Sequence, residues 1–163
     1  MFLFKTTNNL RKSLSNKFFC TRYSKNHLWI SINNNNNSNN NNNNNNNIII
    51  GTLGLTENGP INKFDDVLYI KFPIIKDENQ VDDEPLTISL DTISDQILLN
   101  SPIRNCKLIS INQDVLDYPN YINSSPMSKG WLCKIKFSNI NDFNSLMNKN
   151  EYDNYCKNKI IKI

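Results

Sequence analysis

Two apolar stretches of the chain, His27-Leu-Trp-Ile-Ser-Ile32 and Ile48-Ile-Ile-Gly-Thr-Leu-Gly-Leu55, decide the class of fold. Both are rich in β-branched and aromatic residues, which favours strands. Between them lie two runs of asparagine, Asn33–Asn37 and Asn39–Asn47. Loop closure costs little more as a loop lengthens, so such an insertion is tolerated at a hairpin tip. We therefore expect an antiparallel strand pair with a disordered poly-Asn insertion, 33–47, in its loop; an interaction or aggregation tract is the alternative interpretation.

The rest of the chain continues this pattern of short, alternating strands bounded by Pro, Asn or Asp. Further strands are predicted at 67–72, 86–90, 96–99, 106–111 and 131–137. Two segments are predicted to be helical, namely 115–121, which Pro119 interrupts, and 141–157, which carries apolar residues on one side. The fold class is therefore mainly β, with short peripheral helices and a C-terminal helix.

Length and composition narrow the function. A chain of 163 residues with a long Asn tract has room for one domain. No stretch approaches the roughly 20 apolar residues of a membrane-spanning helix. The chain has only four glycines and no GxGxxG or GxxxxGK motif, which disfavours a nucleotide-binding loop. We expect neither a membrane nor a nucleic acid as a partner.

Charge is distributed unevenly along the chain. The formal net charge is +3, yet the first acidic residue is Glu57. The first 26 residues hold six of the 18 basic residues, which leaves 12 basic against 15 acidic residues in the remainder. A basic, acid-free segment with interleaved Phe and Leu is typical of a mitochondrial transit peptide. We interpret residues 1–26 as this peptide, cleaved soon after Arg22, with a matrix destination; a basic disordered tail is the alternative.

The cysteines do not form a recognisable site. Cys20, Cys106, Cys133 and Cys156 include no CxxC pair, and His27 is the single histidine. This composition gives little support to a zinc site, and unpaired thiols fit a reducing compartment. A catalytic Cys beside His27 remains an unfavoured alternative. We predict no catalytic residue and no metal site.

Several segments together resemble the H protein family of the glycine cleavage system. The HxW opening matches His27-Leu28-Trp29, and the GTxGxT stretch matches Gly51–Thr56. The block Asn123-Ser-Ser-Pro-Met-Ser-Lys-Gly-Trp-Leu132 is the most specific, because it is close to the family's NSDPYGEGWL. Further matches lie at Asp65–Pro73, Ser101-Pro102, Asn112–Asn123 and Leu146–Tyr155. The resemblance covers 27–157, nearly the whole chain after the predicted transit peptide, and leaves 158–163 as a tail.

This resemblance implies a fold and a role. The fold is lipoyl-domain-like, a barrel-sandwich hybrid or flattened β-barrel with helical additions. The family's H protein is a non-catalytic carrier that holds lipoate on a lysine at a β-hairpin tip. Its partners are the pyridoxal-phosphate-dependent glycine decarboxylase subunit, the aminomethyltransferase and dihydrolipoamide dehydrogenase.

The chain departs from the family at the modified lysine. Counting back seven residues from Ser101-Pro102, Ser94 stands at the position of that lysine. No lysine occurs between Asp77 and Cys106. A serine hydroxyl lacks both the amine that lipoylation requires and the long stem of the arm. We therefore expect an H-protein-like chain that carries no lipoyl cofactor. The alternatives are a binding or regulatory module that docks on glycine cleavage or lipoylation enzymes, and a decaying duplicate.

The remaining motif residues have structural interpretations. We expect Trp29 and Trp131 to lie in the core and Tyr69 to support a strand. Gly51, Gly54 and Gly130 are expected at close backbone approaches, and His27 contacts a partner only in an alternative reading. The acidic loop Asp82–Glu84 is interpreted as solvated, with partner contact as the alternative.

Overall fold

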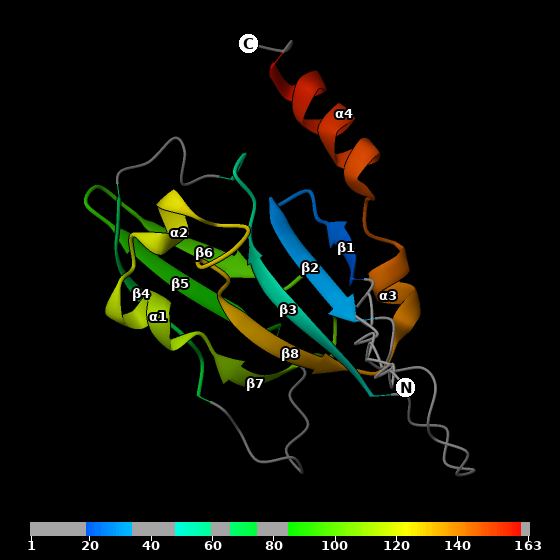
Figure 1. Cartoon of the computed structure of the whole chain (residues 1–163), viewed down its shortest axis with the longest axis horizontal. Helices are drawn as coiled ribbons and strands as arrows, with labels where there is room; N and C mark the ends of the chain where they lie inside the picture. Colours follow the sequence, from blue (N-terminus) through cyan, green and yellow to red (C-terminus); the bar gives the residue numbers. More distant parts are fainter. Residues whose placement is uncertain (1–18, 34–47, 60–65, 75–84, 161–163) are drawn as a thin grey trace, which may run out of the picture.

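The computed structural model describes residues 19–33, 48–59, 66–74 and 85–160, and within them it places eight strands and four short helices (Figure 1). The strands are β1 (Phe19–Tyr23), β2 (Leu28–Asn33), β3 (Ile49–Leu55), β4 (Val67–Lys71), β5 (Thr87–Thr92), β6 (Gln96–Asn100), β7 (Lys107–Ile111) and β8 (Cys133–Phe137). The helices are α1 (Gln113–Asp117), α2 (Tyr121–Ser124), α3 (Ile140–Asn144) and α4 (Lys149–Ile160). The mainly β fold class is confirmed.

The strands form two antiparallel sheets. The larger sheet has the order β1-β2-β3-β8-β7, and the smaller has the order β4-β5-β6. Among the described strands no pairing joins one sheet to the other, so the sheets are not closed into a barrel. Of the barrel and sandwich forms implied by the resemblance, the structure has the open, two-sheet form.

The predicted hairpin around the Asn tract is present. Strands β2 and β3 pair antiparallel from Leu28 opposite Leu55 to Ile32 opposite Gly51. The side chains of Leu28, Ile30 and Leu53 in this pair are almost fully buried. The insertion 33–47 lies outside the described residues apart from Asn33, which ends β2.

One core lies between the sheets. Most strands contribute alternate residues, as the period of two in a strand requires, whereas β4 contributes Val67 and Ile70, which are three positions apart. The smaller sheet contributes Ile70, Ile88, Leu90 and Leu99, each at most 5% exposed. This regular inward packing leaves the other face of β4-β5-β6 outside the core.

Strand β1 has no counterpart among the predicted strands, because Phe19–Tyr23 lies inside the segment interpreted as a transit peptide. It pairs along its length with β2, from Phe19 opposite Asn33 to Tyr23 opposite Trp29. The Tyr23 side chain is buried and stacks on Tyr152, with 4.9 Å between ring centroids. Residues Phe19–Tyr23 of the predicted transit peptide are therefore part of the folded sheet.

Both predicted helices are divided. Tyr118–Asn120, which includes Pro119, separates α1 from α2. The predicted helix 141–157 is broken between α3 and α4, because the backbone of Met147 forms an isolated bridge with Tyr23 of β1. The Tyr23 N–H donates to the Met147 carbonyl at 2.8 Å, and the Met147 N–H donates to the Tyr23 carbonyl at 3.0 Å. Helix α4 extends to Ile160, so it includes three residues of the expected tail.

The close approaches expected at glycine are confirmed at two instructive positions. A Cβ on Gly54 would lie 2.6 Å from the Trp29 indole ring. A Cβ on Gly130 would lie 2.3 Å from the Tyr121 carbonyl oxygen. Trp29 is 6% exposed, as expected of a core residue, and Trp131 is half-buried beside it. None of the helices in the described part of the chain has the length and apolarity to span a bilayer.

Candidate functional site

The candidate site is the tip of the hairpin formed by β5 and β6. The two strands pair from Thr87 opposite Asn100 to Asp91 opposite Gln96. The Thr92 N–H donates to the Asp95 carbonyl at 2.9 Å, which leaves Ile93 and Ser94 as a two-residue loop. Ser94 therefore lies at the tip of a β-hairpin, and it is exposed.

The loop is held at its base by one buried hydroxyl. Thr92 Oγ1 donates to the Asp95 carbonyl at 2.9 Å and accepts from the Asp95 N–H at 3.1 Å. Thr92 is 8% exposed, so these bonds are partly shielded from water, although Asp95 itself is exposed. Neither Ile93 nor Ser94 has a positive φ, since His27 and Asn105 are the described non-glycine residues that do. A longer side chain at the tip would thus meet no backbone strain.

A charged cluster lies one rung below the loop. Lys71 Nζ donates to Asp91 Oδ2 at 2.9 Å, and Gln96 Nε2 donates to Asp91 Oδ1 at 2.8 Å. These two hydrogen bonds, the one from Lys71 first, lower the pKa of the Asp91 carboxyl. The hydrogen bond between Lys71 and Asp91 also raises the pKa of the Lys71 ammonium. The cluster links all three strands of the smaller sheet on its outer face.

The block Asn123–Leu132, which is the most specific sequence motif, contacts the strand that pairs with this hairpin. Asn123 Oδ1 accepts a hydrogen bond from the Val67 N–H at 3.1 Å. Val67 is in turn the strand partner of Thr92, the residue that holds the loop. The first residue of the Asn123–Leu132 block therefore fixes the strand that adjoins the tip. A link of this kind spans 56 residues and has no signal in local sequence patterns.

Apolar side chains are exposed on the hairpin and on the neighbouring strand β4. Ile93 is 69% exposed in the loop, and Leu98 is 63% exposed on the outer face of β6. Leu68 and Tyr69 are both more than half exposed, because a register shift in β4 lies between Val67 and Tyr69. Tyr69 is a strand residue, as expected, but it points outward rather than into the core. Several exposed apolar groups on one small sheet are typical of an interaction surface.

The hairpin offers no amine at its tip. Lys71 is the lysine whose ammonium reaches the hairpin, and it is engaged by Asp91 on the flank of the sheet. Lys107 begins β7 in the other sheet, and Lys76 lies outside the described residues. The hairpin ends in the hydroxyl of Ser94, which does not fit the amide linkage that the resemblance implies for a lipoyl group.

The other candidate residues are engaged elsewhere. His27 Nδ1 lies 2.7 Å from the hydroxyl of Tyr152, and His27 has the left-handed φ of 61°. The cysteines in the described part of the chain are all free thiols. Within the same residues, no three His, Cys, Asp or Glu side chains gather in a way that would hold a metal ion. The loop Asp82–Glu84 lies outside the described residues.

Comparisons with known proteins agree with this geometry. The family model described as glycine cleavage H-protein matches residues 21–159. A glycine cleavage system H protein of Staphylococcus epidermidis is 30% identical over 132 residues, which cover 80% of this chain and 90% of that protein. Glycine cleavage system H protein 2, mitochondrial, of Arabidopsis thaliana is 22% identical over 97% of this chain and 94% of its own length.

A solved structure has the same fold. The crystal structure of a glycine cleavage system H protein from Mycobacterium marinum superposes with a TM-score of 0.51 at 16% sequence identity. The superposition covers 76% of this chain and 94% of that one. The chain thus shares its fold with a known structure.

Proposed function

Because the chain belongs to the glycine cleavage H-protein family, we propose that it is an H-protein-like component of the mitochondrial glycine cleavage system that carries no lipoyl group. One observation carries the proposal: Ser94 occupies the exposed tip of the β5–β6 hairpin, and no lysine lies between Asp77 and Cys106. Lipoylation forms an amide with an amine, and the hairpin tip presents a hydroxyl instead. The chain therefore acts by binding and catalyses no step itself.

The direct test is the intact mass of the protein purified from cells that supply lipoic acid and a lipoylation enzyme. We expect the wild-type chain to lack the mass increment of a lipoyl group. We expect the Ser94→Lys variant to acquire it, because the loop has no positive φ and accepts a longer side chain. Ile93→Lys is the matched control, since it places the same amine one residue earlier in the same loop.

Each outcome is informative. A lipoyl adduct on the wild-type chain would overturn the proposal. Modification of Ser94→Lys but not of Ile93→Lys would support the assignment of position 94 to the carrier site. If neither variant is modified, the hairpin has lost recognition by the lipoylation enzyme as well as its lysine.

The exposed side chains around the tip favour a second candidate, a regulatory module that docks on a glycine cleavage or lipoylation enzyme. The partners to test are the decarboxylase subunit, the aminomethyltransferase and dihydrolipoamide dehydrogenase. Binding of the wild-type chain without support of glycine decarboxylation would select this candidate. Ile93→Asp should weaken such binding, whereas Phe19→Asp, at a similarly exposed position on β1, should not. A chain that binds none of these enzymes would instead agree with a decaying duplicate.

For the matrix location, we propose a transit peptide that ends before Phe19. The support is strand β1, which pairs with β2 and places Tyr23 against Tyr152. Cleavage after Arg22 would remove four of the five residues of this strand. N-terminal sequencing of the chain recovered from mitochondria should find a start at or before Phe19; a start at Ser24 would contradict the proposal.

A further inference from the structure

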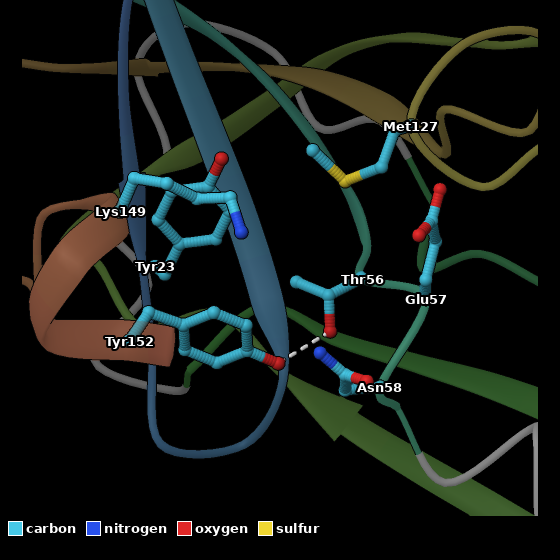
Figure 2. A pocket seen from close by; sticks show the side chains of 7 residues that line it. All are labelled: Tyr23, Thr56, Glu57, Asn58, Met127, Lys149 and Tyr152. Atoms are coloured by element: carbon cyan, nitrogen blue, oxygen red, sulfur yellow. Dashed lines mark hydrogen bonds between the residues drawn. The ribbon is translucent and has the colours of Figure 1, made fainter. Parts of the chain in front are cut away.

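A pocket of about 140 Å³ lies apart from the hairpin tip, between the start of the fold and its C-terminal helix. Its lining comes from four separate segments: Tyr23 of β1, the residues 56–58 after β3, Met127 after α2, and Lys149 with Tyr152 of α4 (Figure 2). Three of these segments lie within or next to the motifs that carried the family resemblance. None of the lining residues belongs to the β5–β6 hairpin.

One wall of the pocket is rigid. The Tyr23 and Tyr152 rings stack with an interplanar angle of 15°. The Tyr152 hydroxyl lies 2.6 Å from Thr56 Oγ1 and 2.7 Å from His27 Nδ1, and Tyr152 is 1% exposed. Burial raises the pKa of Tyr152, so its phenol stays neutral at physiological pH. This wall is therefore preorganised and carries no charge of its own.

The rim of the pocket carries two opposite charges. Lys149 Nζ lies 5.9 Å from the centroid of the Tyr23 ring, and its hydrogen bond to Asp153 raises its pKa. Figure 2 shows the Glu57 carboxylate on the opposite side of the pocket from the Lys149 ammonium. The Thr56 hydroxyl and the Asn58 amide lie between them. The lining thus combines a cation, an anion, two neutral polar groups and apolar walls.

We propose that this pocket binds a small amino acid in its zwitterionic form. The carboxylate faces Lys149 and the ammonium faces Glu57, while the Asn58 amide supplies a neutral hydrogen-bonding partner between them. Glycine is the smallest amino acid that carries both charges, so it is the probe of choice. Because Asp153 competes for Lys149, the affinity expected is about millimolar.

The binding is independent of the hairpin. It uses no residue of the β5–β6 loop, so it holds whether or not position 94 is modified. Binding of glycine by a Ser94→Lys chain with wild-type affinity is therefore expected. Failure of glycine to bind would leave the interpretation of Ser94 untouched, because that rests on intact mass.

The test is a titration of the full chain with glycine, followed by NMR chemical shifts of the pocket residues. Glycine should give saturable shifts around Thr56 and Lys149. Acetate and methylamine, which each carry one of the two charges, should bind at least about tenfold more weakly, since each loses one charged contact. Equal binding of acetate would indicate an anion site and overturn the zwitterion assignment.

Three variants locate the site. Lys149→Gln and Glu57→Gln should each weaken glycine binding about tenfold, which is the expected loss of one charge-assisted contact. Both side chains are exposed on the rim, so the fold is retained. Lys129→Gln is the matched control, because Lys129 also lies over a tyrosine ring, 5.3 Å from the Tyr121 centroid, but lines no part of this pocket. No saturable binding to the wild-type chain, or equal losses in all three variants, would overturn the proposal.

Discussion

The hydroxyl of Tyr152 provides the sharpest test of how the C-terminal helix is held to the sheet. Tyr152→Phe removes only this oxygen and keeps the ring stacked on Tyr23. Two short hydrogen bonds are lost, to Thr56 Oγ1 and to His27 Nδ1. Thr56 is 6% exposed, so its hydroxyl also loses its partner in a buried place.

The magnitude follows from these contacts. Two hydrogen bonds contribute about 1 kcal/mol each, and the buried hydroxyl left behind adds a comparable penalty, so the expected loss is about 3 kcal/mol. For a domain of this size the melting temperature should fall by about 10 °C. Urea unfolding followed by tryptophan fluorescence measures the free energy directly, and its m-value should not change.

Tyr155→Phe is the matched control on the same helix. Its hydroxyl donates to the exposed Lys25 carbonyl at 3.2 Å, so the substitution should cost less than about 0.5 kcal/mol. The double variant Thr56→Val/Tyr152→Phe should cost about 1 kcal/mol less than the sum of the single changes, because the two hydroxyls share one bond. Equal losses for Tyr152→Phe and Tyr155→Phe would refute this account of the helix.

Three further predictions follow from the packing and the charges. Gly54→Ala should cost about 1–3 kcal/mol by displacing the Trp29 ring, and Gly130→Ala should cost more, because the Tyr121 backbone that its Cβ meets cannot move aside; urea unfolding gives both values, and the reverse order would contradict the geometry. Lys71→Met should raise the pKa of the Asp91 carboxyl toward its ordinary value, as measured by an NMR titration. Because this pKa is lowered in the folded state, ionised Asp91 stabilises the hairpin above the ordinary pKa range of an aspartate. That stabilisation is lost as the pH falls through the lowered pKa. Burial raises the pKa of Cys133 to about 12, so iodoacetamide at pH 8 should leave this thiol unmodified until the protein is unfolded; rapid alkylation of the folded chain at Cys133 would show that it is not buried.

Much of the fold was predictable from local patterns. The alternation of apolar and polar residues predicted β2 to β8 to within a few residues, because a strand with one buried face places every second side chain in the core. Strand β1 was not predictable in this way, since Phe19–Tyr23 is short and lies in a basic, acid-free context. The break between α3 and α4 was equally hidden, because Met147 leaves the helix only to meet Tyr23 from the other end of the chain.

The hairpin could be predicted from local sequence patterns, whereas the pocket could not. The place of Ser94 followed from its spacing to Ser101-Pro102, and a turn between two alternating strands is a local signal. The support of Val67 by Asn123 and the meeting of Thr56 with Tyr152 are long-range contacts. No local pattern predicts which of several exposed loops will close over a helix that lies 96 residues later.

The pairing of β1 with the segment before α4 has a consequence for the order of folding. A chain made from its N-terminus presents β1 first, yet the residues that cover it, Met147 and Tyr152, are made among the last. His27 and Tyr152, which are joined by one hydrogen bond, stand 125 positions apart. Closure over so long a separation is slow and late. The edge of the sheet at β1 therefore stays uncovered until nearly the whole chain is present, and the contacts between the two ends of the domain complete the fold.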